Sequence, residues 1–171
     1  MRCPTLTGER TLLRAWSPDE AERYVSSRDA EIIRWTTEEA DLTVAVARAA
    51  IGAAIEDQVT YPFAIVDPAT GAPVGNLPVI QRGEMVTIAY WLAPAARGRG
   101  LLGDALETVL EWLPTTSATV AVLDIHPDNE ASIRAARRAG FTEIGRRASD
   151  ASCAADDGSV LVFERPVVRP A

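Results

Sequence analysis

The sequence contains few of the residues that build disulfide frameworks and metal sites. Two cysteines, Cys3 and Cys153, and one histidine, His126, occur in 171 residues. The cysteines lie far apart, form no CxxC pair and have no histidine pair nearby, so the ligand spacing of a zinc site is absent. We therefore expect two ordinary thiols and no bound metal.

Long hydrophobic runs and an excess of positive charge are also missing. No apolar stretch approaches the roughly 20 residues that span a bilayer, and the N-terminal segment "MRCPTLTGERTLL" lacks the apolar core and cleavage site of a secretory signal. The net charge is −7, which argues against a nucleic-acid partner because phosphate-backbone binders need a basic face. We expect a cytoplasmic protein that binds neither membrane nor nucleic acid, with a mild electrostatic preference for cationic substrates.

The remaining composition is that of one globular domain covering residues 1–171. Apolar residues make up 47% of the chain and charged residues 24%, which is typical of a soluble domain with a substantial core. No internal repeat, low-complexity tract or linker divides it.

Hydrophobic periodicity predicts an alternation of helices and strands. Helices are expected at residues 17–28, 42–58, 99–113 and 129–141, and strands at residues 11–16, 61–67, 71–81, 84–92, 117–125, 141–149 and 159–167. Ser17 and Pro18 form the start signal of the first helix, and Leu42, Val46, Ala49 and Ala53 form one stripe of the second.

These elements predict a mixed α/β fold of about seven strands and four helices. The strands between residues 61 and 92 form an antiparallel meander, joined by the turns "PATGA" and "RGE". A helix then connects strands 86–92 and 119–125, so these two strands should be parallel neighbours, and we expect them to diverge at their C-terminal ends.

The stretch "RGRGLLG" stands at the start of the third helix and has the features of an anion site. Free backbone N–H groups and the positive end of the helix dipole meet there, Gly98 and Gly100 allow close approach of a ligand, and Arg97 and Arg99 add charge. A turn shaped by glycine alone is the simpler alternative. A P-loop is excluded because no lysine follows, and a dinucleotide site using Gly98, Gly100 and Gly103 conflicts with the preceding meander.

Nearly the whole chain resembles the GCN5-related N-acetyltransferases (GNAT), in particular the branch that acts on ribosomal-protein N-termini. The resemblance is carried by "TLTGERTLLRAW", "AYWLAPAARGRGLLGDAL" and "HPDNEASIRAARRAGFTEIGRR". It implies a GNAT-type bent sheet, mostly antiparallel, with a splayed parallel strand pair. It also implies that the pyrophosphate of acetyl-CoA binds the backbone of Arg97, Gly98, Arg99, Gly100, Leu101 and Leu102, although Leu102 replaces the usual glycine or alanine. Trp91, Leu92 and Ala93 match the strand end that binds the pantetheine arm.

The same resemblance gives roles to two residues in "DNEAS". Asn129 matches a cofactor contact, and Ser132 matches a hydroxyl that can donate a proton to the leaving thiolate. Both are also good helix caps, so a capping arrangement without chemistry is an equal alternative. Relatives outside this branch use a tyrosine at the position of Ala136, which favours Ser132 as the general acid here.

The general base is not evident, because Thr87 stands where the branch often has glutamate. Glu84 lies three residues earlier and is a weak candidate. Further carboxylates occur in the expected acceptor loop between the first two predicted helices, namely Glu38, Glu39 and Asp41, which are equally compatible with a solvated loop. Trp35, near that loop, could line an acceptor site or the core, and His126 is an outside candidate that is more often structural at a strand end.

The resemblance thus implies an acetyl-CoA-dependent N-acetyltransferase that uses no metal. Its acceptor is a primary amine, either a small molecule or a peptide N-terminus, attacking the thioester directly, and a homodimer is left open. Two alternatives stand beside this function: a non-catalytic acyl-CoA-binding or sensing module, suggested by Thr87 and Leu102, and a nucleotide-binding domain that uses "GRGLLG".

Overall fold

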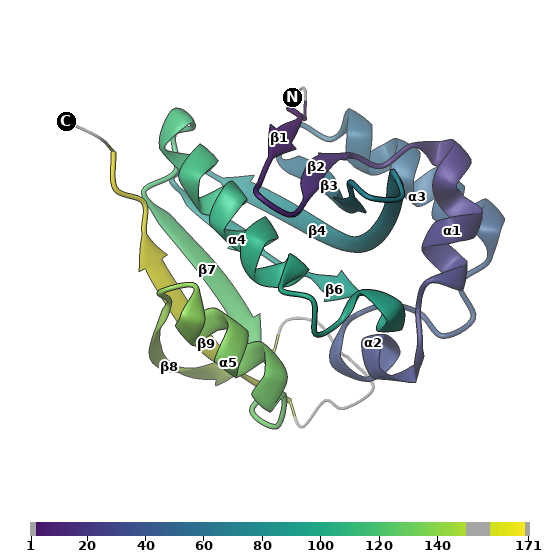
Figure 1. The fold of residues 1–171 in the computed structure, drawn as a ribbon. Coiled ribbons are helices and arrows are strands. Elements are labelled where there is room, and N and C mark those ends of the chain that lie inside the picture. Colours follow the sequence, from purple (N-terminus) through teal and green to yellow (C-terminus); the bar gives the residue numbers. More distant parts are fainter. Residues whose placement is uncertain (1–2, 150–157, 170–171) are drawn as a thin grey trace.

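The computed structural model describes residues 3–149 and 158–169, and in these ranges the strands form a single open sheet (Figure 1). The strands are β1 (Leu6–Thr7), β2 (Leu12–Ala15), β3 (Thr60–Asp67), β4 (Ala72–Arg82), β5 (Met85–Ile88), β6 (Trp91–Leu92), β7 (Val120–Ile125), β8 (Thr142–Ala148) and β9 (Ser159–Pro166). The α-helices are α1 (Ala21–Ser26), α2 (Ala30–Trp35), α3 (Val44–Glu56), α4 (Leu101–Trp112) and α5 (Glu130–Arg138). Short 3₁₀ turns cover Pro18–Glu20, Pro94–Ala96 and Leu113–Thr115.

The sheet has the order β1-β2-β3-β4-β5-β7-β9-β8, and β6 continues alongside β4. All neighbours are antiparallel except β5 and β7, which are parallel and connected through α4. The predicted mixed α/β class, the meander from β3 to β5 and the parallel pair are therefore confirmed. Figure 1 shows α4 lying across the sheet between β4 and β7.

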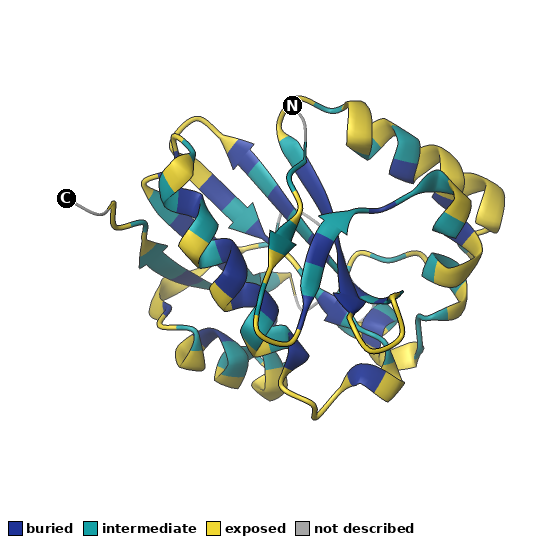
Figure 2. Cartoon of the chain, turned by 45° about the horizontal axis from the view of Figure 1, so that its top comes forward, coloured by how far each residue is buried: buried dark blue, intermediate teal, exposed yellow. Residues whose placement is uncertain are grey.

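Helices cover both faces of the sheet, and β3 lies at the centre of both interfaces. Phe63 belongs to a core cluster with Leu106 of α4, whereas its neighbour Ala64 belongs to a second cluster with Ile51 of α3. Successive side chains of a strand point to opposite faces, so β3 is buried almost along its whole length. Figure 2 shows the buried strands between helices whose outer faces are exposed.

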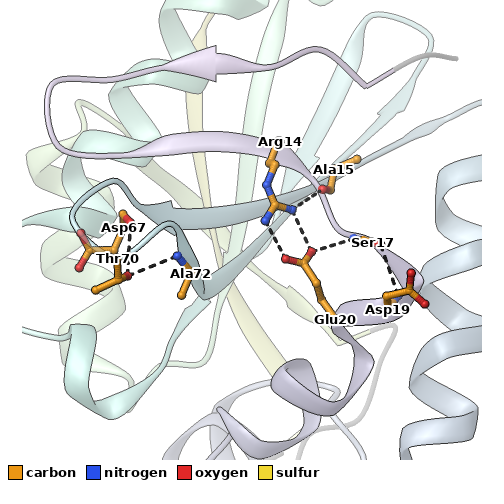
Figure 3. A network of polar contacts seen from close by, with 8 residues as sticks. All are labelled: Arg14, Ala15, Ser17, Asp19, Glu20, Asp67, Thr70 and Ala72. Carbon is orange, nitrogen blue, oxygen red and sulfur yellow. Dashed lines mark hydrogen bonds and ion pairs between the residues drawn. The ribbon is translucent and has the colours of Figure 1, made fainter.

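The start of the first helical segment follows its sequence signal. Ser17 is the N-cap of the Pro18–Glu20 turn, and the Glu20 carboxylate accepts the backbone N–H of Ser17 at 2.9 Å, which completes a capping box. Arg14 donates to both oxygens of Glu20, at 2.8 and 2.7 Å (Figure 3). These hydrogen bonds hold the pKa of Glu20 below its usual value. The turn between β3 and β4 is also as predicted, with Thr70 accepting the N–H of Ala72.

Several boundaries differ from the sequence prediction. The elements β1 and α2, which are two and six residues long, are not among those predicted from the sequence. The predicted strand 84–92 is divided into β5 and β6, because Ala89 lies opposite Pro78, which accepts the N–H of Ala89 but has no N–H to return.

The apolar stripe assigned to the helix around residue 50 was wrong. Val46 is 52% exposed, and the buried residues of α3 are Ala47 and Ile51. An alanine-rich helix has little contrast between its faces, so the periodicity did not select the buried one.

Candidate active site

The sheet opens where β5 and β7 separate. Their parallel pairing runs from Met85 opposite Val120 to Thr87 opposite Val122, and ends there. Beyond this point β6 stays paired with β4, and β7 stays paired with β9 as far as Ile125. The predicted divergence of these strands is confirmed. A cavity of about 1520 Å³ occupies this region and is lined from both faces of the sheet.

The "RGRG" turn forms one part of the cavity wall. Gly98 and Gly100 have φ values of 74° and 77°, a conformation that side chains other than glycine rarely adopt. Gly100 is the N-cap of α4, so the first N–H groups of this helix, from Leu101 to Gly103, have no intrahelical acceptor. A Cβ built on Gly98 has no atom within 4 Å. The turn therefore presents N–H donors to open space.

The two arginines of this turn are engaged in ion pairs. Arg97 donates to both oxygens of Asp29 at 2.8 Å and, through Nε, to the carbonyl of Leu92 at 3.1 Å. The Arg97 guanidinium holds the pKa of Asp29 below its usual value. Arg99 pairs with Asp67 at 2.8 Å, and both line a second, smaller cavity instead. Much of the positive charge expected at the turn is thus offset by carboxylates.

Asp104 fixes the start of α4 against the turn between β1 and β2. Its carboxylate accepts the N–H groups of Glu9 and Arg10 at 3.0 and 3.1 Å and the hydroxyl of Thr11 at 2.5 Å. Gly8 is required here, since a Cβ would overlap the Asp104 carboxylate. The contact also brings Nη1 of Arg10 within 3.9 Å of where a Cβ on Gly100 would lie, so a third guanidinium stands beside the turn.

Ser132 and Tyr90 form a pair of hydroxyl groups in the cavity. Their oxygens lie 2.7 Å apart, and burial raises the pKa of Tyr90. Asn129 caps α5 by accepting the backbone N–H of Ser132 at 3.1 Å. The capping role of Asn129 is therefore present, and it leaves the Ser132 hydroxyl available. Ala136 is fully buried in the core.

Sequence reasoning missed Tyr90, although it lies between the residues matched to the pantetheine strand and Thr87. Tyr90 directly precedes β6, and its contact with Ser132 depends on how α5 packs against the sheet. Trp91 and Leu92 form β6, which pairs with β4 along one edge and faces the opening along the other. Ala93 continues this pairing by donating its N–H to Val74 at 2.8 Å.

Glu38 belongs to a polar network beneath α1. Its carboxylate accepts hydrogen bonds from Tyr24, from the indole of Trp91 at 3.0 Å and from Arg28 at 3.1 Å. Burial and the Glu38 charge raise the pKa of Tyr24. Both oxygens of Glu38 are thus engaged, and neither Glu38 nor Glu39 is among the cavity-lining residues of the described chain.

The other carboxylates proposed from the sequence also lie outside the cavity. Glu39 and Asp41 are exposed in the loop between α2 and α3, which the sequence analysis placed between its first two helices. Glu84 is exposed in the turn before β5, where its carbonyl accepts the N–H of Thr119 at 2.7 Å. That turn is at the opposite end of β5 from Tyr90. Thr87 does line the cavity.

Trp35 and His126 stand together in the cavity wall, with ring centroids 5.2 Å apart. His126 is buried, and its Nδ1 accepts the N–H of Asp128 at 3.1 Å. The neutral ring therefore carries its proton on Nε2. The carboxylates that line the cavity within the described chain are Glu31, Glu107 and Asp124, and none of them was proposed as a catalytic residue from the sequence.

Two further sequence expectations concern membranes and metals. In residues 3–149 and 158–169, no helix combines the length and apolarity needed to cross a bilayer. No cluster of three or more metal-ligating side chains occurs in the same ranges. Cys3 is half-buried, and burial raises the pKa of its thiol to about 12; Cys153 lies outside the described residues.

Comparison with solved structures shows the same fold in several acetyltransferases. RimL, a ribosomal L7/L12 α-N-protein acetyltransferase in complex with coenzyme A, superimposes with a TM-score of 0.83 at 18% identity over 96% of this chain and 98% of that one. RimJ of Mycobacterium smegmatis, with a CoA disulfide, gives 0.84 at 19% identity over 97% and 90%. Spermidine N-acetyltransferase of Vibrio cholerae, with CoA and spermine, gives 0.80 at 16% identity over 92% and 96%.

Sequence comparison identifies the family directly. A search of curated proteins finds no significant match, whereas a model of the acetyltransferase (GNAT) domain matches residues 10–142. This range includes the sheet opening, the glycine turn and the Tyr90–Ser132 pair. Since the match covers most of the chain and the fold agrees with it, the protein belongs to the GNAT acetyltransferase family.

Proposed function

We propose that the protein transfers the acetyl group of acetyl-CoA to a primary amine by direct attack of the amine on the thioester. The observation that carries this proposal is the Tyr90–Ser132 hydroxyl pair, located where two parallel strands separate inside a large cavity. A half-buried proton donor beside an open strand edge suits a reaction in which a thiolate leaves from an extended thioester.

The residues around the opening fit such a cosubstrate. The free N–H groups from Leu101 to Gly103 and the glycine turn suit a diphosphate, and the open edge of β6 suits an amide-containing arm that hydrogen-bonds like a strand. The cavity, at about 1520 Å³, exceeds the usual 300–1,000 Å³ of small-ligand sites. Acetyl-CoA supplies the activated acetyl group, and the chain supplies its orientation.

The hydroxyl groups of Tyr90 and Ser132 are placed to donate a proton to the leaving sulfur. Ser132 lies on α5 with its hydroxyl 2.7 Å from that of Tyr90, so either group can pass a proton to the sulfur as the carbon–sulfur bond breaks. The raised pKa of Tyr90 keeps its hydroxyl protonated at neutral pH.

The acceptor is a primary amine, either a peptide N-terminus or a small molecule. Among proteins of this fold, RimL acts on the N-terminus of a ribosomal protein, and another is a spermidine acetyltransferase. These substrates share a primary amine that is protonated at neutral pH, which is the class proposed here.

Two measurements test this function separately. Thermal unfolding with coenzyme A, acetyl-CoA and NAD measures the ligand preference, and thiol release from acetyl-CoA with spermine and short peptides measures transfer. We expect stabilisation by both CoA forms and release that depends on the amine. Binding without release for any amine would favour the sensing module, and stabilisation by NAD alone would favour a nucleotide-binding domain.

A further inference from the structure

Asp124 stands at the opening of the sheet, on the face away from Ser132. Its neighbours on β7, Leu123 and Ile125, point into the core cluster that α5 covers. Because side chains alternate along a strand, Asp124 points to the other face. It lies two residues beyond Val122, the last residue of β7 that pairs with β5, and it lines the cavity.

The two oxygens of Asp124 have different surroundings. Oδ2 accepts a hydrogen bond from Nη2 of Arg147 on β8 at 2.5 Å and forms an ion pair with it. Oδ1 is buried and has no hydrogen-bond partner among the described residues. A buried acceptor without a donor is unfavourable, so a ligand that supplies an N–H group at this point would remove that cost.

Other ionisable groups lie on the surrounding elements. His126 is on the same strand, Glu164 is beside Val122 on β9, and Glu31 is on α2. Glu31 already accepts the indole N–H of Trp35 at 2.8 Å. Arg147 contributes the cation that faces Asp124 in the described structure.

We propose that Asp124 is a catalytic residue that binds the ammonium group of the acceptor through Oδ1 and accepts its proton. This inference rests on the proposed acetyl transfer and assigns the base that Thr87 cannot provide. The acceptor would then enter from the face of Trp35 and His126, opposite the Tyr90–Ser132 pair. The thioester would lie in the opening between these two proton-handling groups.

The protons balance along this path. The ammonium gives one proton to Asp124, and the neutral nitrogen forms a bond to the acetyl carbon. The carbon–sulfur bond breaks, and the sulfur takes a proton from the Tyr90–Ser132 pair. The nitrogen loses its second proton to solvent as the amide forms, and the Tyr90–Ser132 pair takes one proton back from solvent. Asp124 passes its proton to solvent, so one amide, one thiol and one proton result from one ammonium and one thioester.

Asp124→Asn is the main test, because it keeps the shape of the side chain and removes the charge. The acceptors are spermine and the peptide Ser-Ala-Ala, and the readout is thiol release from acetyl-CoA. We expect kcat/KM for the better acceptor to fall about 10²-fold at pH 7, within the usual contribution of a general base. Stabilisation by coenzyme A should remain at the wild-type level, which shows that the variant is folded.

The pH profile distinguishes a base from a structural residue. The loss in Asp124→Asn should shrink as pH rises toward the pKa of the amine, about 10.4 for an alkylamine, because free amine then needs no base. Glu143→Gln is the matched control, since Glu143 is also paired with an arginine, Arg137 at 3.1 Å, but lies outside the cavity. It should match the wild type.

Two more variants distinguish loss of the carboxylate from a folding defect. Asp124→Ser is smaller and uncharged and should show the same loss, whereas Asp124→Glu retains a carboxylate and should recover part of the rate. A kcat/KM of Asp124→Asn within threefold of the wild type at pH 7, with an unchanged pH profile, overturns the proposal. Failure of the wild-type protein to bind coenzyme A or transfer acetyl would instead overturn the proposed function.

Discussion

Removal of the Ser132 hydroxyl tests whether the Tyr90–Ser132 pair acts in chemistry. The cap of α5 uses the backbone N–H of Ser132 and the side chain of Asn129, so Ser132→Ala leaves this cap in place. The loss is one hydrogen bond of 2.7 Å, worth about 1 kcal/mol, or roughly 2–4 °C in Tm for a chain of this size. We expect kcat to fall about 10²-fold, with the Kd for acetyl-CoA changed by less than about threefold.

The double variant gives a sharper test. If the two hydroxyls act as a unit, Tyr90→Phe with Ser132→Ala should be about as slow as the slower single variant, rather than about 10⁴-fold impaired. Steady-state rates of thiol release measure kcat, and equilibrium titration with acetyl-CoA measures its Kd. Thr115→Val is the control, since its hydroxyl bonds to the carbonyl of Trp112 away from the cavity. Equal losses in kcat and in binding for Ser132→Ala would refute the reasoning.

Three other changes have defined outcomes. Gly100→Glu should abolish stabilisation by coenzyme A, because it adds a negative charge at the glycine turn, while Gly100→Ala carries the backbone strain of φ 77°, about 1–2 kcal/mol, and should keep most of the ligand effect in thermal unfolding. Glu20→Gln should cost about 1 kcal/mol at pH 7, a value discounted for partial exposure. Because the pKa of Glu20 is lowered by Arg14, this contribution is present above the unfolded value of about 4.3 and is lost as pH falls through the folded value; urea unfolding should show a smaller difference between wild type and variant at pH 3 than at pH 7. Thr87→Glu should change kcat/KM at pH 7 by less than about threefold if Asp124 is the base; a large rise would mean that the wild-type protein has no base.

Much of the fold could be predicted from the sequence because its signals are local. The Ser17 and Pro18 start signal and the strand predicted at 117–125 each depend on a few neighbouring residues, and the structure has Ser17 as an N-cap and β7 at Val120–Ile125. The predictions failed where local contrast was low. The alanine-rich α3 gave a wrong face, and the short α2 has too few residues for a clear period.

The candidate site was harder to predict because its members come from distant segments. Arg97 and Arg99 predicted positive charge at the glycine turn. In the structure, Asp29 and Asp67, which are distant in the sequence, form ion pairs with them. Glu38 had the right chemistry in a suitable loop, yet hydrogen bonds from other segments engage both of its oxygens.

The sequence by itself determined most of the element order, the parallel pair around α4 and the glycine turn, because strand periodicity, helix caps and glycine positions are encoded over short stretches. Only the tertiary structure decided which polar groups meet. Tyr90 and Ser132 are brought together by the packing of α5 on the sheet, and Asp124 is exposed to the cavity because β5 and β7 stop pairing after Thr87 and Val122. Such contacts depend on the relative placement of elements, and a hydrogen bond acts over about 3 Å, so no pattern along the chain could have predicted them.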